Sequence, residues 1–186
     1  GLEGAAARGV RGVAVGDLSV GAGGTSFAST NMRDFNLENM SLYYGSLSGT
    51  FSPKGQMSGS VTSSGGSVTF EGRYDAHYEE QASLTALAGR YSGQVGTRFG
   101  VESMSLQITP GGAITGSSLT GCNVSGTAGL QGANAVYTLR LTYGSGCKLN
   151  GVTHTGHAVL TPGTLLRAVA TAQDLSDAVI FIGSKF

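Results

Sequence analysis

Apolar and polar residues alternate along much of this chain. The alternation is clearest over residues 104–108, where Met, Leu and Ile occupy every second position, and over residues 137–143. Successive side chains of a strand point to opposite faces, so this period of two predicts strands with one buried face. Helical spacing is rare, and only residues 79–87 and the alanine-rich residues 3–7 are expected to form a short helical turn.

Turn-forming residues separate these segments. They are Ser-Pro-Lys-Gly at 52–55, Ser-Ser-Gly-Gly at 63–66, Thr-Pro-Gly-Gly at 109–112 and Thr-Pro-Gly at 161–163. Proline presets the first turn dihedral and glycine tolerates the last, so each cluster predicts a hairpin connection.

An internal repeat is found when the chain is shifted along itself by 57 residues. Residues 51–60 then overlay residues 108–117, and both read as apolar, Ser or Thr, Pro, any residue, Gly, any residue, apolar, Ser or Thr, Gly, Ser. After a three-residue change in loop length, residues 70–72 correspond to residues 124–126. The two halves are therefore interpreted as diverged copies of one antiparallel meander.

The second copy, at 89–186, contains enough strands to close on itself. Its expected strands cover residues 90–96, 101–109, 113–118, 122–128, 135–143, 151–160, 164–172 and 178–184. Eight short consecutive antiparallel strands predict an up-and-down β-barrel, which leaves no open edge. The predicted fold class is all-β.

The first copy, at 1–88, is incomplete. Its expected strands cover residues 9–16, 24–30, 46–52, 56–62 and 67–74, too few for a closed barrel. Either the two halves share one sheet or a further N-terminal piece completes this copy, and the second explanation is favoured. The chain begins at Gly1 without an initiator Met or a signal pattern, which indicates a mature or trimmed product from which an anchor could have been removed.

Cys122 and Cys147 are the only two cysteines. A hairpin of residues 122–128 and 135–143 would bring Cys122 close to Cys147, so a disulfide is predicted. By loop entropy it would stabilise the fold by roughly 3 to 4 kcal/mol. Such bonds persist in oxidising compartments, which indicates the periplasm, the outer-membrane surface or secretion. Two buried reduced thiols are the alternative.

Charge and motifs narrow the function classes. Eleven basic residues balance eleven acidic ones, and charged residues are only 12% of the chain. Without a net positive field, binding to nucleic acid is not expected. No apolar run has the length of a membrane span and no nucleotide-binding glycine motif is present, so neither a transmembrane segment nor a cofactor is expected.

Catalytic and metal sites have little support. His154 and His157 are three residues apart, which places their rings on opposite faces of a strand and disfavours a shared metal. Gly-x-Ser-x-Gly is absent, and Asp174 with Asp177 is interpreted as part of a loop between the last two strands. No catalytic residue is therefore assigned.

Two segments are candidates for a contact surface. Arg33, Asp34 and Phe35 bring charge and an aromatic ring into a polar stretch that is expected to be a loop, although a structural pairing of Arg33 with Asp34 explains them equally well. Tyr74, His77 and Tyr78 form a second cluster, in the expected linker between the halves. A solvated connection whose tyrosines cover an edge of the core is the alternative for this cluster.

Several segments carry a resemblance to a known group of proteins. They are residues 32–37, 51–60, 90–93, 121–122 and 181–185. In these segments the chain resembles uncharacterised lipoproteins and secreted proteins of Gram-negative bacteria. The resemblance implies a lipid-modified Cys and an extra hairpin ahead of the region seen here. In architecture the chain is also similar to the eight-stranded lipoprotein barrels related to transferrin-binding and factor-H-binding surface proteins.

Three functions are compatible with these patterns. The leading hypothesis is a non-enzymatic envelope or surface module with a side-chain-filled barrel, whose loops contact a protein or a surface polymer. The alternative is a carrier of a small apolar ligand, with a cavity lined by Tyr137, Leu139, Leu141 and Val159 or by the residues that alternate with them. The third is a hydrolase with a cryptic triad that includes His154 or His157.

Overall fold

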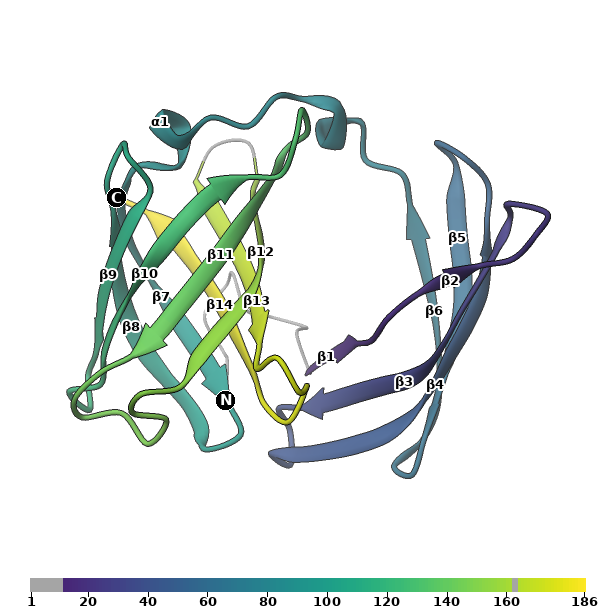
Figure 1. The fold of residues 1–186 in the computed structure, drawn as a ribbon, viewed down its shortest axis with the longest axis horizontal. Coiled ribbons are helices and arrows are strands. Elements are labelled where there is room, and N and C mark those ends of the chain that lie inside the picture. The colour runs from purple at the N-terminus through teal and green to yellow at the C-terminus, as the bar shows by residue number, and fades with distance from the viewer. Residues whose placement is uncertain (1–11, 162–163) are drawn as a thin grey trace. The chain divides into compact units, whose positions relative to one another are not determined.

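Strands make up 62% of the residues that the structure describes and helices 5%, so the predicted all-β fold is confirmed (Figure 1). The computed structural model describes residues 12–161 and 164–186, and the expected helical residues 3–7 lie outside this range. Contacts divide the described chain into a unit at 12–77 and a unit that begins at Tyr78. Residues 78–88 therefore belong with the barrel.

The second unit is a closed eight-stranded barrel. Its strands are β7 (Gly89–Thr97), β8 (Gly100–Ile108), β9 (Ala113–Ser118), β10 (Asn123–Leu130), β11 (Val136–Tyr143), β12 (Thr153–Leu160), β13 (Leu165–Thr171) and β14 (Ala178–Lys185). Each strand pairs antiparallel with the next, and β14 returns to β7 with Phe181 opposite Val95. All eight strands coincide closely with the predicted segments, so the barrel prediction is confirmed.

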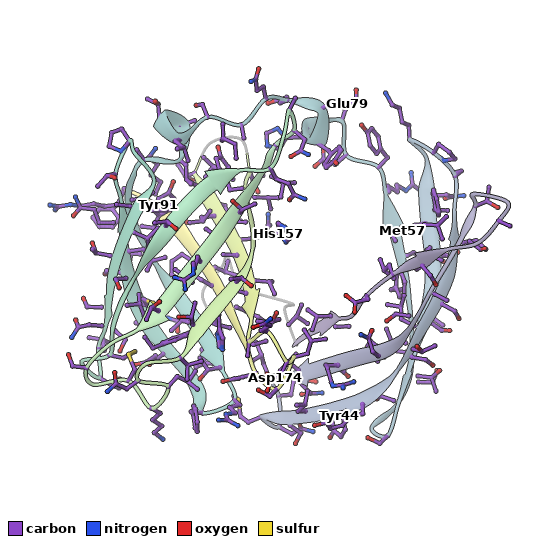
Figure 2. All side chains as sticks on the ribbon, viewed as in Figure 1. Tyr44, Met57, Glu79, Tyr91, His157 and Asp174 are labelled. Carbon is purple, nitrogen blue, oxygen red and sulfur yellow. A yellow bond between two sulfur atoms is a disulfide. The ribbon has the colours of Figure 1, made fainter. Side chains whose placement is uncertain are left out.

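Every second side chain of the barrel strands points inward. The inward residues form one buried apolar cluster, which includes Tyr91, Leu106, Val124, Tyr137 and Phe181. Tyr91, labelled in Figure 2, is fully buried in this cluster. Most outward positions are Ser, Thr, Gly and charged residues, so the outside of the barrel is mainly polar. Ile180 and Ile182 of β14, which alternate with the inward Phe181, are apolar exceptions and are buried.

A single helical turn, α1 (Leu84–Leu87), covers one end of the barrel. Ser83 caps it, with its side-chain oxygen accepting the amide of Ala86 at 3.1 Å. Leu87 is fully buried in the barrel core, and its carbonyl accepts the hydroxyl of Tyr91 at 2.6 Å. The helical turn expected within residues 79–87 is therefore present, preceded by a 3-10 turn, η1 (Ala76–Glu79).

The first unit is a single antiparallel sheet that curls into half a barrel (Figure 1). Its strands are β1 (Gly12–Val15), β2 (Ser19–Val20), β3 (Ser26–Asn36), β4 (Ser41–Phe51), β5 (Gln56–Ser63) and β6 (Gly66–Arg73). The order is β1-β3-β4-β5-β6, and β2 also pairs with β3. Two strands are longer than predicted, and the two-residue β2 was not predicted.

The prediction that residues 33–36 form a loop was wrong, because this segment is the second half of β3. The pairing with β4 shifts between Ser29 and Met32. Such a bulge interrupts the alternation of faces, so the sequence pattern of a strand is lost there. Phe35 is buried opposite Val13 of β1 and is not an exposed contact.

The internal repeat corresponds to two hairpins with matching turns, β4–β5 and β8–β9. In the first, the Ser52 amide donates to the Gln56 carbonyl at 2.9 Å, and the Gln56 amide donates to the Ser52 hydroxyl at 3.1 Å. In the second, the Thr109 amide donates to the Ala113 carbonyl at 2.9 Å, and the Ala113 amide donates to the Thr109 hydroxyl at 3.0 Å. The predicted strand, turn and returning strand are confirmed in both halves.

Candidate functional site at the disulfide end of the barrel

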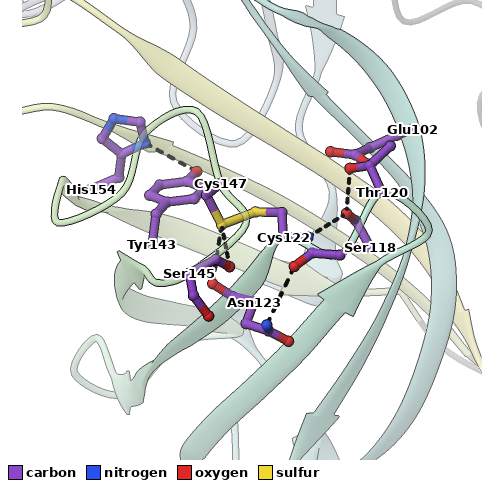
Figure 3. Close-up of a disulfide and its surroundings, with 10 residues drawn as sticks. Glu102, Ser118, Thr120, Cys122, Asn123, Tyr143, Ser145, Cys147 and His154 are labelled. Atoms are coloured by element: carbon purple, nitrogen blue, oxygen red, sulfur yellow. Dashed lines mark hydrogen bonds between the residues drawn. A yellow bond between two sulfur atoms is a disulfide. The ribbon is translucent and has the colours of Figure 1, made fainter.

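The predicted disulfide between Cys122 and Cys147 is confirmed (Figure 3). Cys122 ends the β9–β10 loop and Cys147 lies in the β11–β12 loop, with 4.3 Å between their Cα atoms. Both loops lie at the barrel end opposite α1, because strand connections alternate between the two ends. We call this the disulfide end.

Backbone hydrogen bonds join the same two loops. The Asn123 amide donates to the Ser145 carbonyl at 3.1 Å, and the Gly144 amide donates to the Asn123 carbonyl at 2.8 Å. Gly146 has a φ of +78°, and a Cβ there would overlap the carbonyl of Gly121. The loops are thus held together by a covalent bond and by a close approach that requires glycine.

A pocket of about 310 Å³ lies between the bridged loops and the β7–β8 turn. Its lining includes Phe99, Glu102, Thr120, Tyr143 and Lys148. The Thr120 hydroxyl donates to Oε2 of Glu102 at 2.6 Å, which fixes the carboxylate at the rim. The pocket therefore combines aromatic rings with both signs of charge.

Two cations lie against the ring of Phe99 at the surface of the disulfide end. The guanidinium of Arg98 lies 4.8 Å from the ring centroid, and the ammonium of Lys148 lies 5.3 Å from it. Both distances are within the range of cation–π attraction. Leu119, in the β9–β10 loop, is 84% exposed. An exposed leucine, an exposed phenylalanine and two cations thus share one end of the barrel.

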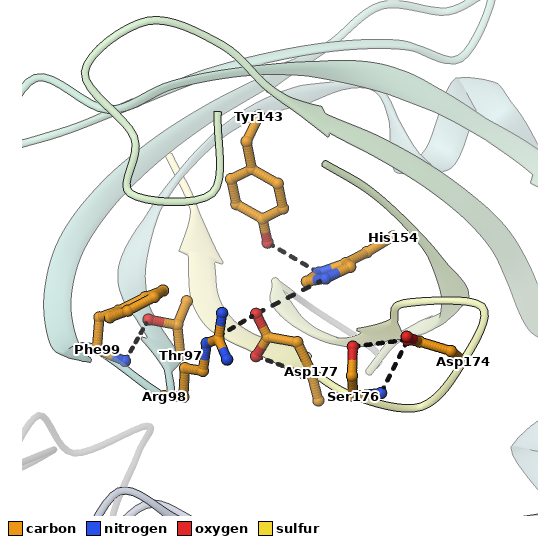
Figure 4. A network of polar contacts seen from close by, with 9 residues as sticks. Thr97, Arg98, Phe99, Tyr143, His154, Asp174, Ser176 and Asp177 are labelled. Carbon is orange, nitrogen blue, oxygen red and sulfur yellow. Dashed lines mark hydrogen bonds and ion pairs between the residues drawn. The ribbon is translucent and has the colours of Figure 1, made fainter. Parts of the chain in front are cut away.

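A buried polar network lies inside the barrel below these loops (Figure 4). Nδ1 of His154 is 3.3 Å from the Tyr143 hydroxyl, and Nε2 of His154 is 4.0 Å from Oδ2 of Asp177. Arg98 reaches the same Asp177 oxygen from the β7–β8 turn at 3.6 Å. Oδ1 of Asp177 accepts the Ala178 amide at 2.8 Å.

Burial controls the ionisation of this network. It lowers the pKa of His154, an effect that Asp177 opposes and Arg98 reinforces. It raises the pKa of Asp177, while the Ala178 amide and the charges of His154 and Arg98 act in the opposite direction. It also raises the pKa of the Tyr143 hydroxyl. His154 is therefore a neutral imidazole at neutral pH.

The network gives no support to nucleophilic catalysis. The His154 ring is fully buried, and its described contacts are with Tyr143 and Asp177. His157 lies on the exposed outer face of β12, so the two histidines occupy opposite faces as predicted (Figure 2). Among the residues that the structure describes, no group of three or more His, Cys, Asp or Glu could hold a metal ion.

The predicted contact residues are spread over both units. Arg33 stacks on the ring of Tyr44 at 4.4 Å and donates to the backbone carbonyls of Asn31 and Met32 at 3.0 and 3.2 Å. Asp34 is partly buried, which raises its pKa.

The expected linker cluster is also divided. Tyr74 and His77 belong to the first unit, whereas Tyr78 belongs to the barrel unit. The Tyr78 carbonyl accepts the Ala135 amide at 3.0 Å, and its hydroxyl accepts the Asn134 side-chain amide at 3.4 Å. These bonds attach Tyr78 to the β10–β11 loop.

Sequence reasoning missed Phe99, Leu119 and Lys148. The available signal was the presence of apolar side chains in turns, since Phe99 precedes Gly100 and Leu119 stands among Ser, Thr and Gly. Apolar side chains in short polar turns are commonly exposed, as Phe99 and Leu119 are, whereas Leu149 in the longer β11–β12 loop is buried.

Comparisons with known proteins leave the geometry of the chain as the basis for a functional inference. No family model, curated protein sequence or solved structure matches it. Within residues 12–161 and 164–186, no helix has the length and apolar character needed to cross a membrane.

Proposed function

We propose that this chain is a non-enzymatic module of the bacterial cell envelope or exterior that binds a protein or a surface polymer through the disulfide end of its barrel. The observation that carries the proposal is the exposed Phe99, with the cations of Arg98 and Lys148 against its ring, on the same end as the exposed Leu119. Aromatic residues and arginine are the side chains most enriched at binding hot spots.

The rigidity of this end supports the same proposal. Ordering flexible loops during association costs free energy, and a surface that is already ordered avoids part of that cost. The Cys122–Cys147 bond and the hydrogen bonds between Asn123 and the opposite loop provide this order before a partner arrives. The ion pair between the buried Asp177 and the half-exposed Arg98 anchors the turn that carries Phe99.

The packed interior favours a platform over a carrier. Of the four residues expected to line a ligand cavity, Tyr137 and Leu139 are buried in the apolar core and Leu141 packs against it. Val159 faces outward and is exposed. The interior positions are occupied by side chains of the protein itself, which supports the filled-barrel hypothesis.

The location belongs to the same proposal. A disulfide persists in the periplasm, at the outer-membrane surface or in a secreted protein, and these are the locations we propose. A lipid anchor outside these residues, which the sequence resemblance implies, would tether the module to the envelope.

Site-specific photo-crosslinking in intact cells of the source bacterium tests the binding surface. A photoreactive residue at Leu119 is compared with one at Leu130, which is 45% exposed at the α1 end of the same barrel. We expect a discrete crosslinked product from position 119 that weakens when Phe99→Ala is added. Equal products from positions 119 and 130, or none from 119, would contradict the proposal.

Native mass spectrometry of the protein purified from its own host distinguishes the proposed binding platform from the alternative, a ligand carrier. A bare chain agrees with the platform, whereas a bound small apolar molecule would favour the carrier. Free thiols are counted in the same sample under denaturing conditions. None is expected, because both cysteines are paired.

A further inference from the structure

Strand β6 forms an unpaired edge of the first unit. Among the described residues it pairs with β5 alone, from Gln56 opposite Arg73 to Ser63 opposite Gly66. The Tyr74 amide donates to the Gly55 carbonyl, so the backbone groups of Arg73 and Glu71 point away from β5 by alternation. An exposed strand of this length is a template for pairing with another strand.

The repeat shows what an equivalent strand does in the closed barrel. Strands β3 to β6 correspond to strands β7 to β10, because each set contains a row of directly paired residues at equivalent places in the repeat. In the first set the row is Phe27, Gly49, Gly59 and Phe70. In the second set it is Tyr91, Leu106, Gly116 and Val124. In the barrel, β10 continues into a pairing with β11, with Val124 opposite Tyr143. The first unit thus contains four strands of an eight-strand pattern.

The concave face of the half-barrel is apolar like the barrel core. The Phe27 ring lies 6.2 Å from the Phe51 ring and 6.3 Å from the Phe70 ring. Met57 and Val68 on the same face are 41% and 62% exposed. By contrast, Ile114, the equivalent of Met57 in the repeat, is buried in the barrel. This apolar face extends to the free edge of the sheet through Val68 and Phe70 of β6.

The opposite face of β6 carries complementary charges. Glu71 and Arg73 are both exposed and lie two residues apart on that face. If two β6 strands pair antiparallel around a two-fold axis at Gly72, Glu71 of each copy lies opposite Arg73 of the other. The same register places Phe70 opposite Tyr74 of the second copy, on the apolar face. Opposite charges and aromatic rings are favourable cross-strand pairs.

We infer that two copies of this chain associate through antiparallel pairing of β6 with β6, in the register centred on Gly72. The paired segment is short, residues 70–74 of each copy, because β6 ends at Arg73 and η1 begins at Ala76. It joins the two sheets at this edge and uses the same surface of both copies. A two-fold axis at residue 71 would place Glu71 against Glu71, and an axis at residue 70 would leave Glu71 opposite Thr69. The charges therefore select the register at Gly72.

Charge reversal on the full chain tests the register. Sedimentation velocity over a concentration series is expected to show a monomer–dimer equilibrium for the natural sequence. Glu71→Arg or Arg73→Glu alone places like charges opposite each other twice and should raise the dimer dissociation constant on the order of tenfold. The double variant restores opposite charges and should return the constant close to its original value.

A cysteine at the two-fold axis tests the geometry independently. Gly72 is a position whose backbone faces β5, so the two copies of residue 72 form a close non-hydrogen-bonded pair with Cα atoms about 4.5 Å apart. A Cβ at Gly72 would contact only the flexible Met57 side chain, at 3.1 Å from its Cγ. Gly72→Cys should therefore give a disulfide-linked dimer under mild oxidation, and Val68→Cys on the same face should not.

Three results would overturn the inference. The first is a monomer at every concentration up to hundreds of micromolar, with or without the charge variants. The second is crosslinking at residue 68 as readily as at residue 72. The third is a dimer whose dissociation constant is unaffected by either single charge reversal, which would place the interface elsewhere. Circular dichroism of each variant confirms that the strands are intact.

Discussion

Nε2 of His154 lies 4.0 Å from Oδ2 of Asp177 inside the barrel, and both side chains are buried. Neither atom has a hydrogen-bond partner among the described residues. The Arg98 guanidinium reaches Asp177 from the turn that carries Phe99. The ionisation of this pair is thus connected by direct contact to the surface that we propose for binding.

Acidification is expected to destabilise the fold through His154. Burial holds its pKa below the ordinary 6.5, so from pH 6.5 down to the lowered value the unfolded chain binds a proton that the folded chain does not. Stability should therefore fall as the pH drops through this window, by at most about 1.4 kcal/mol per pH unit. Urea unfolding at a series of pH values measures the slope.

Two variants identify the group that causes this pH dependence of stability. His154→Gln should flatten it, whereas His157→Gln on the exposed outer face should leave it unchanged. Asp177 acts with the opposite sign, because its raised pKa makes the folded state bind more protons from 3.8 up to that pKa. A slope that persists in His154→Gln would show that another group carries the pH dependence.

Removal of the disulfide is expected to lower the free energy of unfolding by about 3 to 4 kcal/mol, because it frees a loop of 25 residues in the unfolded chain. The double variant Cys122→Ser, Cys147→Ser avoids an unpaired thiol. Urea unfolding of this variant is compared with the natural chain before and after reduction. If the natural chain keeps its unfolding midpoint in reductant, the bond contributes much less than loop entropy predicts.

Leu87→Ala tests the role of α1 at the opposite end. Leu87 is fully buried, so its truncation leaves a cavity in the barrel core and should cost about 2 to 5 kcal/mol. Leu130→Ala, at an exposed position of the same end, should cost less than about 0.5 kcal/mol. Similar values for both variants in urea unfolding would mean that α1 does not seal the core.

Gly156→Ala tests a close approach between strands. A Cβ on Gly156 in β12 would overlap the Val169 carbonyl of β13, which is backbone and cannot move aside. We expect a loss of about 1 to 3 kcal/mol, in the range of overpacking. Gly111→Ala serves as the matched control, because its nearest contact is the Thr109 side chain at 3.9 Å. Equal melting temperatures for both variants would contradict this.

The barrel was predictable because the alternation of buried and exposed residues can be recognised within each strand separately. From Met104 to Ile108 and from Tyr137 to Tyr143, one face is packed inside and the other is in water, so every second residue reports its side. The turns carried their own signals in Pro and Gly. Hydrogen-bonded closure through β14 and β7 then follows from the number of strands.

The first unit was less predictable for a physical reason. In β3 the extra residue of the bulge between Ser29 and Met32 keeps Met32 on the same face as Phe27, although the two are five residues apart. A pattern of period two cannot survive such a shift. Likewise, the candidate site at Phe99 depends on which loops meet at one end of the barrel, and only the three-dimensional closure brings Lys148 to that ring.

Closure of the barrel by β14 has a consequence for how the chain reaches its folded state. Lys185 pairs with Tyr91, so β7, the first strand of the barrel, stays without its second neighbour until β14 is available. Folding is slow when contacts join such distant segments, because the chain loses loop entropy before these contacts can stabilise it. Loss of β14 would therefore cost the cooperativity of the whole barrel, since it would open β7 and β13 together.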